Sequence, residues 1–150
     1  MYYPKTRKMK KKTILLLPAL WGLMAACQEN FDERCAREAR EYTEKQCPRR
    51  MDICTIMDSL TYDEATHTLN YYYTLEGELD TDSMMNKENC GKIEDLLRKN
   101  IINSVELKTY KENGINFAYC YHSKTTGKAR LQVCFTPEDY GNGIPANDKK

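Results

Sequence analysis

Few side chains in this 150-residue sequence have the types and spacing that acid–base, nucleophilic or metal chemistry needs. The two histidines, His67 and His122, each lie beside a predicted hairpin turn. A single right-handed crossover between the two hairpins would place those turns at opposite ends of a sheet. Because a metal or acid–base site needs groups that converge, we predict neither a metal nor a cofactor.

Two further groups could be reactive. Cys120 and His122 alternate onto one face of a strand, as a nucleophile and its base would, but in an oxidising compartment a cysteine is more often in a disulfide. Asp58 is predicted on the apolar face that carries Leu60 and Tyr73, where an unpaired carboxylate is costly. We interpret it as a structural group bound by the Tyr73 hydroxyl or by a backbone bulge. A functional acid of raised pKa is the alternative.

Aromatic stacking on a ligand would depend on tyrosine, because the sole tryptophan, Trp21, lies in an N-terminal segment that we expect to be removed. Strand alternation directs Tyr72 away from the core, which makes it the best exposed aromatic candidate. Strand propensity explains the tyrosine-rich strands more simply. The candidate binding residues are therefore Asp58, Tyr72 and His122.

The N-terminal segment has the pattern of an export signal. Six basic residues fall within the first twelve positions, and residues 14–26 are uncharged, too short a run to span a bilayer. Ordinary cleavage needs small residues at −1 and −3, which the chain lacks. The segment Leu23-Met24-Ala25-Ala26-Cys27 instead resembles a bacterial lipobox. We predict that residues 1–26 are a lipoprotein signal peptide and that Cys27 is lipidated.

The charge balance changes once that segment is set aside. The whole chain has 23 basic and 22 acidic residues, but all six early basic residues leave with residues 1–26. The remainder is net acidic, so a nucleic-acid partner is not expected, because such binding depends on clustered Lys and Arg.

The cysteine count agrees with this interpretation. Seven cysteines are an odd number for an exported protein, and assigning Cys27 to lipid leaves an even set. Up to three disulfides are predicted, with the connectivity left open, among Cys35, Cys47, Cys54, Cys90, Cys120 and Cys134.

The remaining pattern predicts one α+β domain over residues 27–140, followed by a disordered tail over residues 141–150. Asn30 and Glu33 form a capping-box pattern at the start of a helix that ends before Pro48. Hairpins are predicted over residues 53–76 and 115–136, with two helices between them. The expected order is α-β-β-α-α-β-β, with a four-stranded antiparallel sheet whose tyrosine-rich face is covered by the helices.

The hairpin registers follow from side-chain alternation. In the first hairpin the expected pairs are Tyr62 with Leu69, Leu60 with Tyr71, and Ile56 with Leu75. In the second they are Tyr121 with Leu131, Tyr119 with Val133, and Phe117 with Phe135. This second register makes Cys120 and Cys134 diagonal neighbours.

Several segments together suggest a family. They are Cys47-Pro48 through Asp52, Met57-Asp58-Ser59, Leu69 through Leu75, Ser104-Val105-Glu106-Leu107 and Gly114 through Tyr121. The chain resembles a group of small exported bacterial proteins, several of them lipoproteins, that have a helix-hairpin-helix-hairpin pattern and no established activity. The resemblance implies a fold and a location but no mechanism.

The sequence therefore favours a non-enzymatic binding or structural module, anchored in the cell envelope and contacting a protein partner there. In the lipoprotein sorting scheme that the lipobox resembles, Gln28 after the lipidated cysteine favours the outer membrane, on its periplasmic or surface face. One alternative is an inhibitor of an extracytoplasmic enzyme, which would present the loop from Glu78 to Lys87. The other is a small exported hydrolase using Asp58 or His122, which needs a concave pocket.

Overall fold

The fold is built on one sheet in the strand order β1-β2-β3-β4-β5, shown in a computed structural model that describes residues 29–141. The predicted signal peptide, the lipidation site Cys27 and residues 142–150 of the predicted tail lie outside the described residues. The elements are α1 (Phe31–Gln46), β1 (Arg49–Arg50), β2 (Thr55–Asp63), β3 (Thr68–Leu75), the 3-10 helix η1 (Gly77–Asp80), α2 (Lys87–Asn103), α3 (Lys108–Glu112), β4 (Asn116–Ser123), β5 (Ala129–Phe135) and α4 (Pro137–Tyr140).

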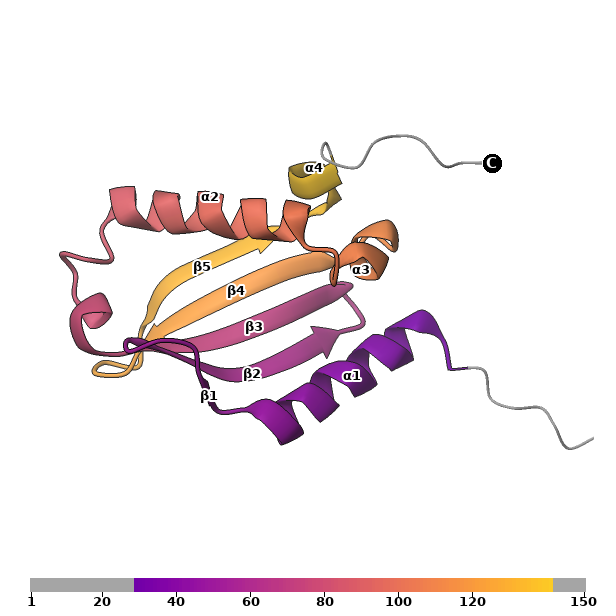
Figure 1. Ribbon diagram of the computed structural model, residues 1–150, viewed down its shortest axis with the longest axis horizontal. Coiled ribbons are helices and arrows are strands. Elements are labelled where there is room, and N and C mark those ends of the chain that lie inside the picture. The colour runs from indigo at the N-terminus through magenta and orange to yellow at the C-terminus, as the bar shows by residue number, and fades with distance from the viewer. Residues whose placement is uncertain (1–28, 142–150) are drawn as a thin grey trace, which may run out of the picture.

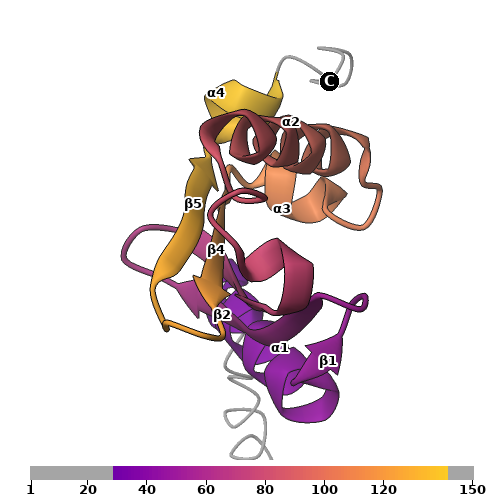
Figure 2. The same cartoon turned by 90° about the vertical axis from the view of Figure 1, so that its left-hand side faces the viewer.

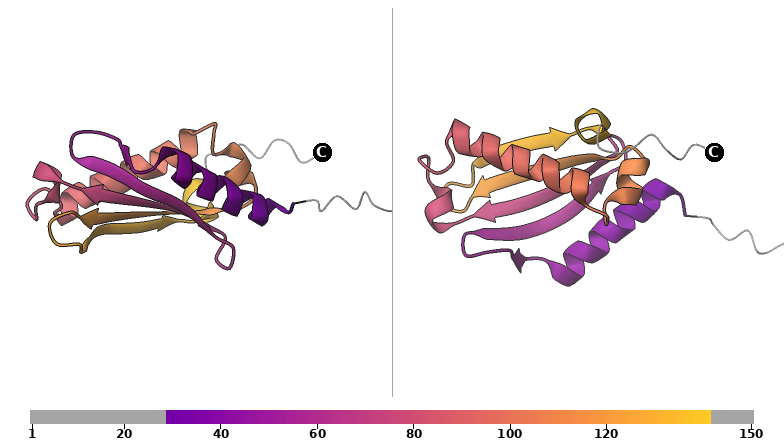
Figure 3. Two further views of the ribbon diagram at one scale, coloured as in Figure 1. Left: turned by 90° about the horizontal axis from the view of Figure 1, so that it is seen from below. Right: turned by 45° about the horizontal axis from the view of Figure 1, so that its top comes forward.

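The molecule has two layers. The helices α1, α2 and α3 lie on one face of the sheet, and the other face is uncovered (Figures 1 and 2). The helix α1 packs on β2, whereas α2 packs on β5 and α4. On this one face, the two long helices therefore lie towards opposite edges of the sheet, and the central strands β3 and β4 lie between them (Figure 3).

The sheet differs from the predicted one in two respects. It has five strands, because Arg49 and Arg50 form a short edge strand beside Met57 and Ile56. Two residues are too few to carry an alternation pattern, so this strand could not be predicted from the sequence. The central pair β3 and β4 is parallel, with Leu69 beside Phe117, so the sheet is mixed and not antiparallel throughout. The helical connection through α2 and α3 returns the chain to the end at which β3 began, which is a crossover connection.

The predicted registers hold except at one point. Tyr62 pairs with Leu69 and Leu60 with Tyr71, as predicted. Leu75, however, pairs with Thr55 and not with Ile56, because the register shifts between Met57 and Ser59. This is a β-bulge, which places one extra residue on one strand. The second hairpin has all three predicted pairs, Tyr121 with Leu131, Tyr119 with Val133 and Phe117 with Phe135.

Local signals fix the first helix. Both hydrogen bonds of the predicted capping box are present: the Glu33 N–H donates to the Asn30 side chain (2.8 Å) and the Asn30 N–H donates to Glu33 (3.1 Å). The apolar stripe of α1 buries Cys35 and Ala39 against the sheet. The core that they border consists of Leu69, Ile101, Ile115, Phe117, Tyr119, Phe135 and Tyr140.

The helix α1 also protects the edge of β2. The Thr43 hydroxyl donates to the Leu60 carbonyl (2.7 Å) and accepts from the Leu60 N–H (2.8 Å). The short strand β1 pairs only with Ile56 and Met57, so Leu60 has no partner strand on that edge of β2. The Thr43 side chain takes the place of such a partner, which lowers the risk that this edge pairs with a strand of another molecule. None of the described helices has the length and apolar character to cross a bilayer.

Candidate functional site

Four tyrosines on the helix-covered face form a ladder along the centre of the sheet. Because β3 and β4 are parallel and in register, Tyr71 lies beside Tyr119 and Tyr73 beside Tyr121. Each pair is stacked, with ring centroids 4.8 Å apart and interplanar angles of 6° and 13°. We call these four residues the tyrosine strip.

The hydroxyls of the tyrosine strip are partly covered but not sealed from solvent. None of them has a hydrogen-bond partner within residues 29–141, and no buried side-chain nitrogen or oxygen of that range is left unpaired. Tyr71, Tyr73 and Tyr121 are half-buried, whereas Tyr119 is only 6% exposed. The rings are packed into the sheet surface and the hydroxyls remain available to a ligand.

Those hydroxyls stay protonated. Burial raises the pKa of Tyr121 to about 12, with a smaller contribution from Asp52. Burial first, and the neighbouring tyrosines second, raise the pKa of Tyr71, Tyr73 and Tyr119 above the ordinary value. At neutral pH the strip therefore offers hydrogen-bond donors and carries no charge.

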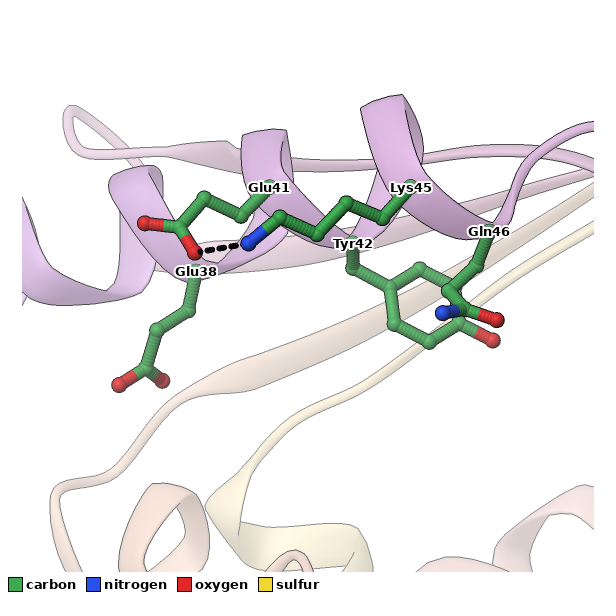
Figure 4. Close-up of a pocket in the computed structure, with 5 residues that line it drawn as sticks. All are labelled: Glu38, Glu41, Tyr42, Lys45 and Gln46. Carbon is green, nitrogen blue, oxygen red and sulfur yellow. Dashed lines mark hydrogen bonds and ion pairs between the residues drawn. The ribbon is translucent and has the colours of Figure 1, made fainter.

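A depression of about 280 Å³ lies on the flank of α1 and is lined by Glu38, Glu41, Tyr42, Lys45 and Gln46 (Figure 4). The Lys45 ammonium donates to Glu41 at 2.9 Å along the helix. The half-buried Tyr42 ring reaches towards the sheet, where its hydroxyl contacts the Met57 sulfur at 3.7 Å. Tyr42 is also among the neighbours that raise the pKa of Tyr71 and Tyr73, after burial. This depression therefore borders the tyrosine strip.

The helix α3 lies at one end of this region. The Tyr110 hydroxyl donates to Glu38 at 2.8 Å, and the Tyr110 ring contacts the edge of Phe31, with centroids 6.3 Å apart. Tyr110 is also a neighbour of Tyr71. The arrangement places aromatic rings from α1, α3, β3 and β4 around one partly exposed surface.

The three predicted binding residues lie on the other, uncovered face. The bulge turns Asp58 away from the tyrosine face, so the prediction that it shares a face with Tyr73 is wrong. Asp58 is exposed, and its carboxylate accepts from the Thr74 hydroxyl at 2.8 Å. Thr74 is the register partner of His122, and Tyr72 is the register partner of Cys120. The fold thus gathers Asp58, Tyr72 and His122 on one face.

That face does not supply what a hydrolase would need. Neither the depression on the α1 flank nor a second one, between α1 and β2 beside Thr43 and Leu60, is lined by a predicted binding residue. The Asp58 carboxylate is already bound by Thr74. Neither depression joins His122 or Asp58 to another polar group, which is the arrangement that the hydrolase alternative would require.

The histidines lie at opposite ends of the sheet, as the crossover predicts, because His67 precedes β3 and His122 lies near the end of the parallel strand β4. His67 belongs to a cluster that the sequence did not reveal. Its Nδ1 lies 3.1 Å from the Asp32 carboxylate, which also accepts from the Tyr62 hydroxyl at 2.6 Å. This cluster joins the start of α1 to the β2–β3 turn. Within the described part of the chain, no group of three His, Cys, Asp or Glu residues could hold a metal ion.

The six cysteines predicted to form disulfides are free thiols in the structure. Cys120 lies opposite Gln132 and Cys134 opposite Ala118, which is the predicted diagonal placement. Cys35 is buried in the core, and burial raises its pKa to about 11. The others lie on different elements, so the fold brings no pair together as a disulfide, and the pairing stays a prediction.

The loop from Glu78 to Lys87 has a fixed conformation, as the inhibitor hypothesis requires. The buried Asp80 accepts from the Thr125 N–H (2.9 Å) and from Arg130 (3.2 Å). Hydrogen bonding from Ser123, and then from Thr125, lowers the pKa of Asp80. The loop is therefore fastened to the β4–β5 hairpin.

Comparison with known proteins gives a family and a fold. A family described as a domain of unknown function (DUF8479) matches residues 30–132. No curated protein matches the chain in sequence. A protein from Pseudomonas aeruginosa, described as secreted, has a similar structure, with a TM-score of 0.58 and 11% identity over 72% of this chain and 94% of that one.

Two pilotins of type II secretion systems also have this fold. AspS from Vibrio cholerae is 14% identical, with a TM-score of 0.54, over 79% of this chain and 99% of its own. EpsS from Vibrio vulnificus is 8% identical, with a TM-score of 0.53, over 72% of this chain and 89% of its own. At these identities the similarity concerns the fold alone.

Proposed function

This chain belongs to the DUF8479 family of domains of unknown function, and we propose that it is a non-enzymatic, lipid-anchored envelope protein that binds a segment of a partner protein on the tyrosine strip. The anchor is the lipid on Cys27, and the location is the outer membrane. The pilotin and secreted-protein folds support an envelope role, because they show that this architecture serves proteins of that compartment.

The observation that carries the binding proposal is the set of unpaired hydroxyls on the tyrosine strip. A core face that only supported helices would need no hydroxyls there, because burying a polar group without a partner is costly. Here Tyr71, Tyr73 and Tyr121 are half-buried, and their hydroxyls have no hydrogen-bond partner among residues 29–141. Tyrosine combines a large apolar area with a hydrogen-bond donor, which is why it is enriched at protein interfaces.

The chemistry of this surface indicates the kind of segment that it binds. Stacked rings offer apolar contact area, and the neutral hydroxyls donate to carbonyl or side-chain oxygens of the partner. On the α1 flank, Glu41 and Lys45 neutralise each other, so the rim adds little net charge. We expect a partner segment with apolar side chains on one side and hydrogen-bond acceptors near them.

Two neighbouring residues of β3 provide the test. A photoreactive amino acid is placed at Tyr73, on the tyrosine strip, or at Tyr72, on the opposite face of the same strand. We expect irradiation of producing cells to give a discrete protein adduct from position 73 and none from position 72. Equal adducts from both positions, or none from position 73, would contradict binding at the strip.

The anchor is tested separately. Intact mass of the processed protein should show a lipid-modified N-terminus at Cys27, and the Cys27→Ala variant should leave the membrane fraction. A wild-type protein without lipid mass would remove the anchor and leave the crosslinking result to be judged by itself.

A further inference from the structure

The short strand β1 and the loop that joins it to β2, together residues 49–54, present apolar side chains to solvent on a hydrogen-bonded backbone. We call this segment the tip. The Met51 and Asp52 N–H groups donate to the Thr55 carbonyl (2.9 and 3.4 Å), and the Cys54 N–H donates to the Asp52 carboxylate (2.7 Å). A loop pinned by so many of its own hydrogen bonds presents its side chains in a defined arrangement.

Two of those side chains are unusually exposed. Ile53 is 87% exposed and Met51 is 49% exposed. Single exposed apolar residues are common on protein surfaces, but here two of them lie on one short, ordered loop. The hydrogen-bonded backbone of the loop therefore holds these two aliphatic side chains in water.

Three cations and two carboxylates lie on or beside the tip, so the positive groups are in excess by one. Arg50 and Lys124 both bind Glu76, at 2.6 and 2.5 Å, so two cations share one carboxylate. Arg49 is exposed and has no ion-pair partner among residues 29–141. The Asp52 carboxylate is turned into the loop by its bond to the Cys54 N–H. The local charge is therefore positive in a protein whose domain is net acidic.

We propose that the tip is a second membrane contact, which inserts Ile53 and Met51 into the headgroup region of an anionic bilayer. Aliphatic side chains flanked by Lys and Arg are the combination that binds the bilayer interface. Protein-binding hot spots are instead enriched in Trp, Tyr and Arg packed in desolvated pockets. The tip has no aromatic residue, and both of its arginines are exposed.

The position of the tip fits this role, which rests on the proposed lipid anchor. In the sequence the predicted anchor comes shortly before α1, and the tip follows the C-terminal end of that helix through β1 (Figure 1). Sixteen residues of helix span about 24 Å at 1.5 Å per residue. With α1 along the membrane, both ends contact the bilayer, and the anchor gives the tip a high effective concentration there.

The sequence offers a direct probe, because its only tryptophan is Trp21, within the predicted signal peptide. Processed protein carrying Ile53→Trp is mixed with excess vesicles of phosphatidylethanolamine and phosphatidylglycerol. Leu96→Trp is the matched control, because Leu96 is 58% exposed on α2, away from the tip. We expect the emission of Ile53→Trp to move to shorter wavelength and to be quenched by bromine-labelled lipid, with neither change in Leu96→Trp.

Charge variants test the electrostatic part. In the Ile53→Trp background, a titration with these vesicles should show that Arg49→Gln lowers the equilibrium constant for insertion of the tip about fivefold. Lys99→Gln, on the exposed side of α2, should leave it unchanged. If the emission of Ile53→Trp is not shifted, or if Leu96→Trp responds equally, the membrane contact is wrong.

Flotation of the same vesicles separates this proposal from the anchor. Protein that does not float but shows the Ile53→Trp shift retains the tip contact and loses the anchor. Protein that floats without the shift retains the anchor and overturns the tip contact.

Discussion

Lys111 closes the C-terminal end of α2, and replacing it should destabilise the domain more than any exposed lysine would. Its buried ammonium donates to the carbonyls of Ile101 (2.8 Å), Ile102 (2.8 Å) and Ser104 (3.0 Å). All three donors of the ammonium are used, on groups that a helix end leaves unpaired. The substitution Lys111→Met keeps the aliphatic stem and removes the three donors.

The expected cost follows from what each carbonyl loses. Ile101 is fully buried, so its carbonyl is left without a partner, at about 1–3 kcal/mol. Loss of the cation from the helix C-terminus adds about 0.3–1 kcal/mol. The carbonyls of the half-buried Ile102 and Ser104 can turn to water, and burying Met in place of an ammonium returns part of the loss. We expect a net loss of about 1–3 kcal/mol, which lowers the melting temperature by roughly 5–10 °C in a domain of this size.

Urea unfolding followed by far-ultraviolet circular dichroism measures this loss. The matched control is Lys108→Met on the same short helix, where the side chain is 70% exposed and its partner Glu112 is also on the surface. The control should change the free energy of unfolding by less than about 0.5 kcal/mol. If the two variants lose the same stability, Lys111 does not act as the cap described here.

Three further outcomes are expected. Thr43→Val should cost about 1–2 kcal/mol by removing both bonds to Leu60, and Thr43→Ser should restore most of it; equal losses would refute the edge-capping role. The lowered pKa of Asp80 contributes stability that is present above the unfolded value, about 3.9, and is lost as the pH falls below it. Asp80→Asn should therefore flatten acid unfolding, whereas Asp82→Asn, at a side chain 95% exposed, should not. Asn30→Ala should cost about 1 kcal/mol in thermal unfolding, and an unchanged midpoint would contradict the capping box.

Local and short-range features of the fold could be predicted from the sequence. The capping box at Asn30 and the register of the β4–β5 hairpin depend on residues that are close in the sequence. There the residue types and their alternation allow a single helix start and a single strand register. The bulge at Asp58 could not be located in the same way. An extra residue in a strand leaves the residue types unchanged, and only the pairing of Leu75 with Thr55 reveals it.

The predicted binding residues and the proposed tyrosine strip lie on opposite faces of the sheet. Tyr72 was selected because alternation directs it away from the core, and the tyrosines on the other face were assigned to packing under the helices. A signal was available, because four hydroxyl-bearing residues on a supposedly buried face are more than a dry core accepts. The sequence could not indicate that α1 and α2 lie towards opposite edges of the same face, which leaves the central tyrosines partly exposed.

The sequence by itself determined the α+β class, the order of the main elements, the first helix cap and most of the hairpin pairing. These follow from periodicity and capping, which act over a few residues. The tertiary structure alone decided that β3 and β4 run parallel, and therefore that Tyr71 stacks on Tyr119 and Tyr73 on Tyr121. Residues about 48 positions apart carry no local record of which strand will be their neighbour. That choice depends on the path of the α2–α3 crossover and on the packing of the whole domain.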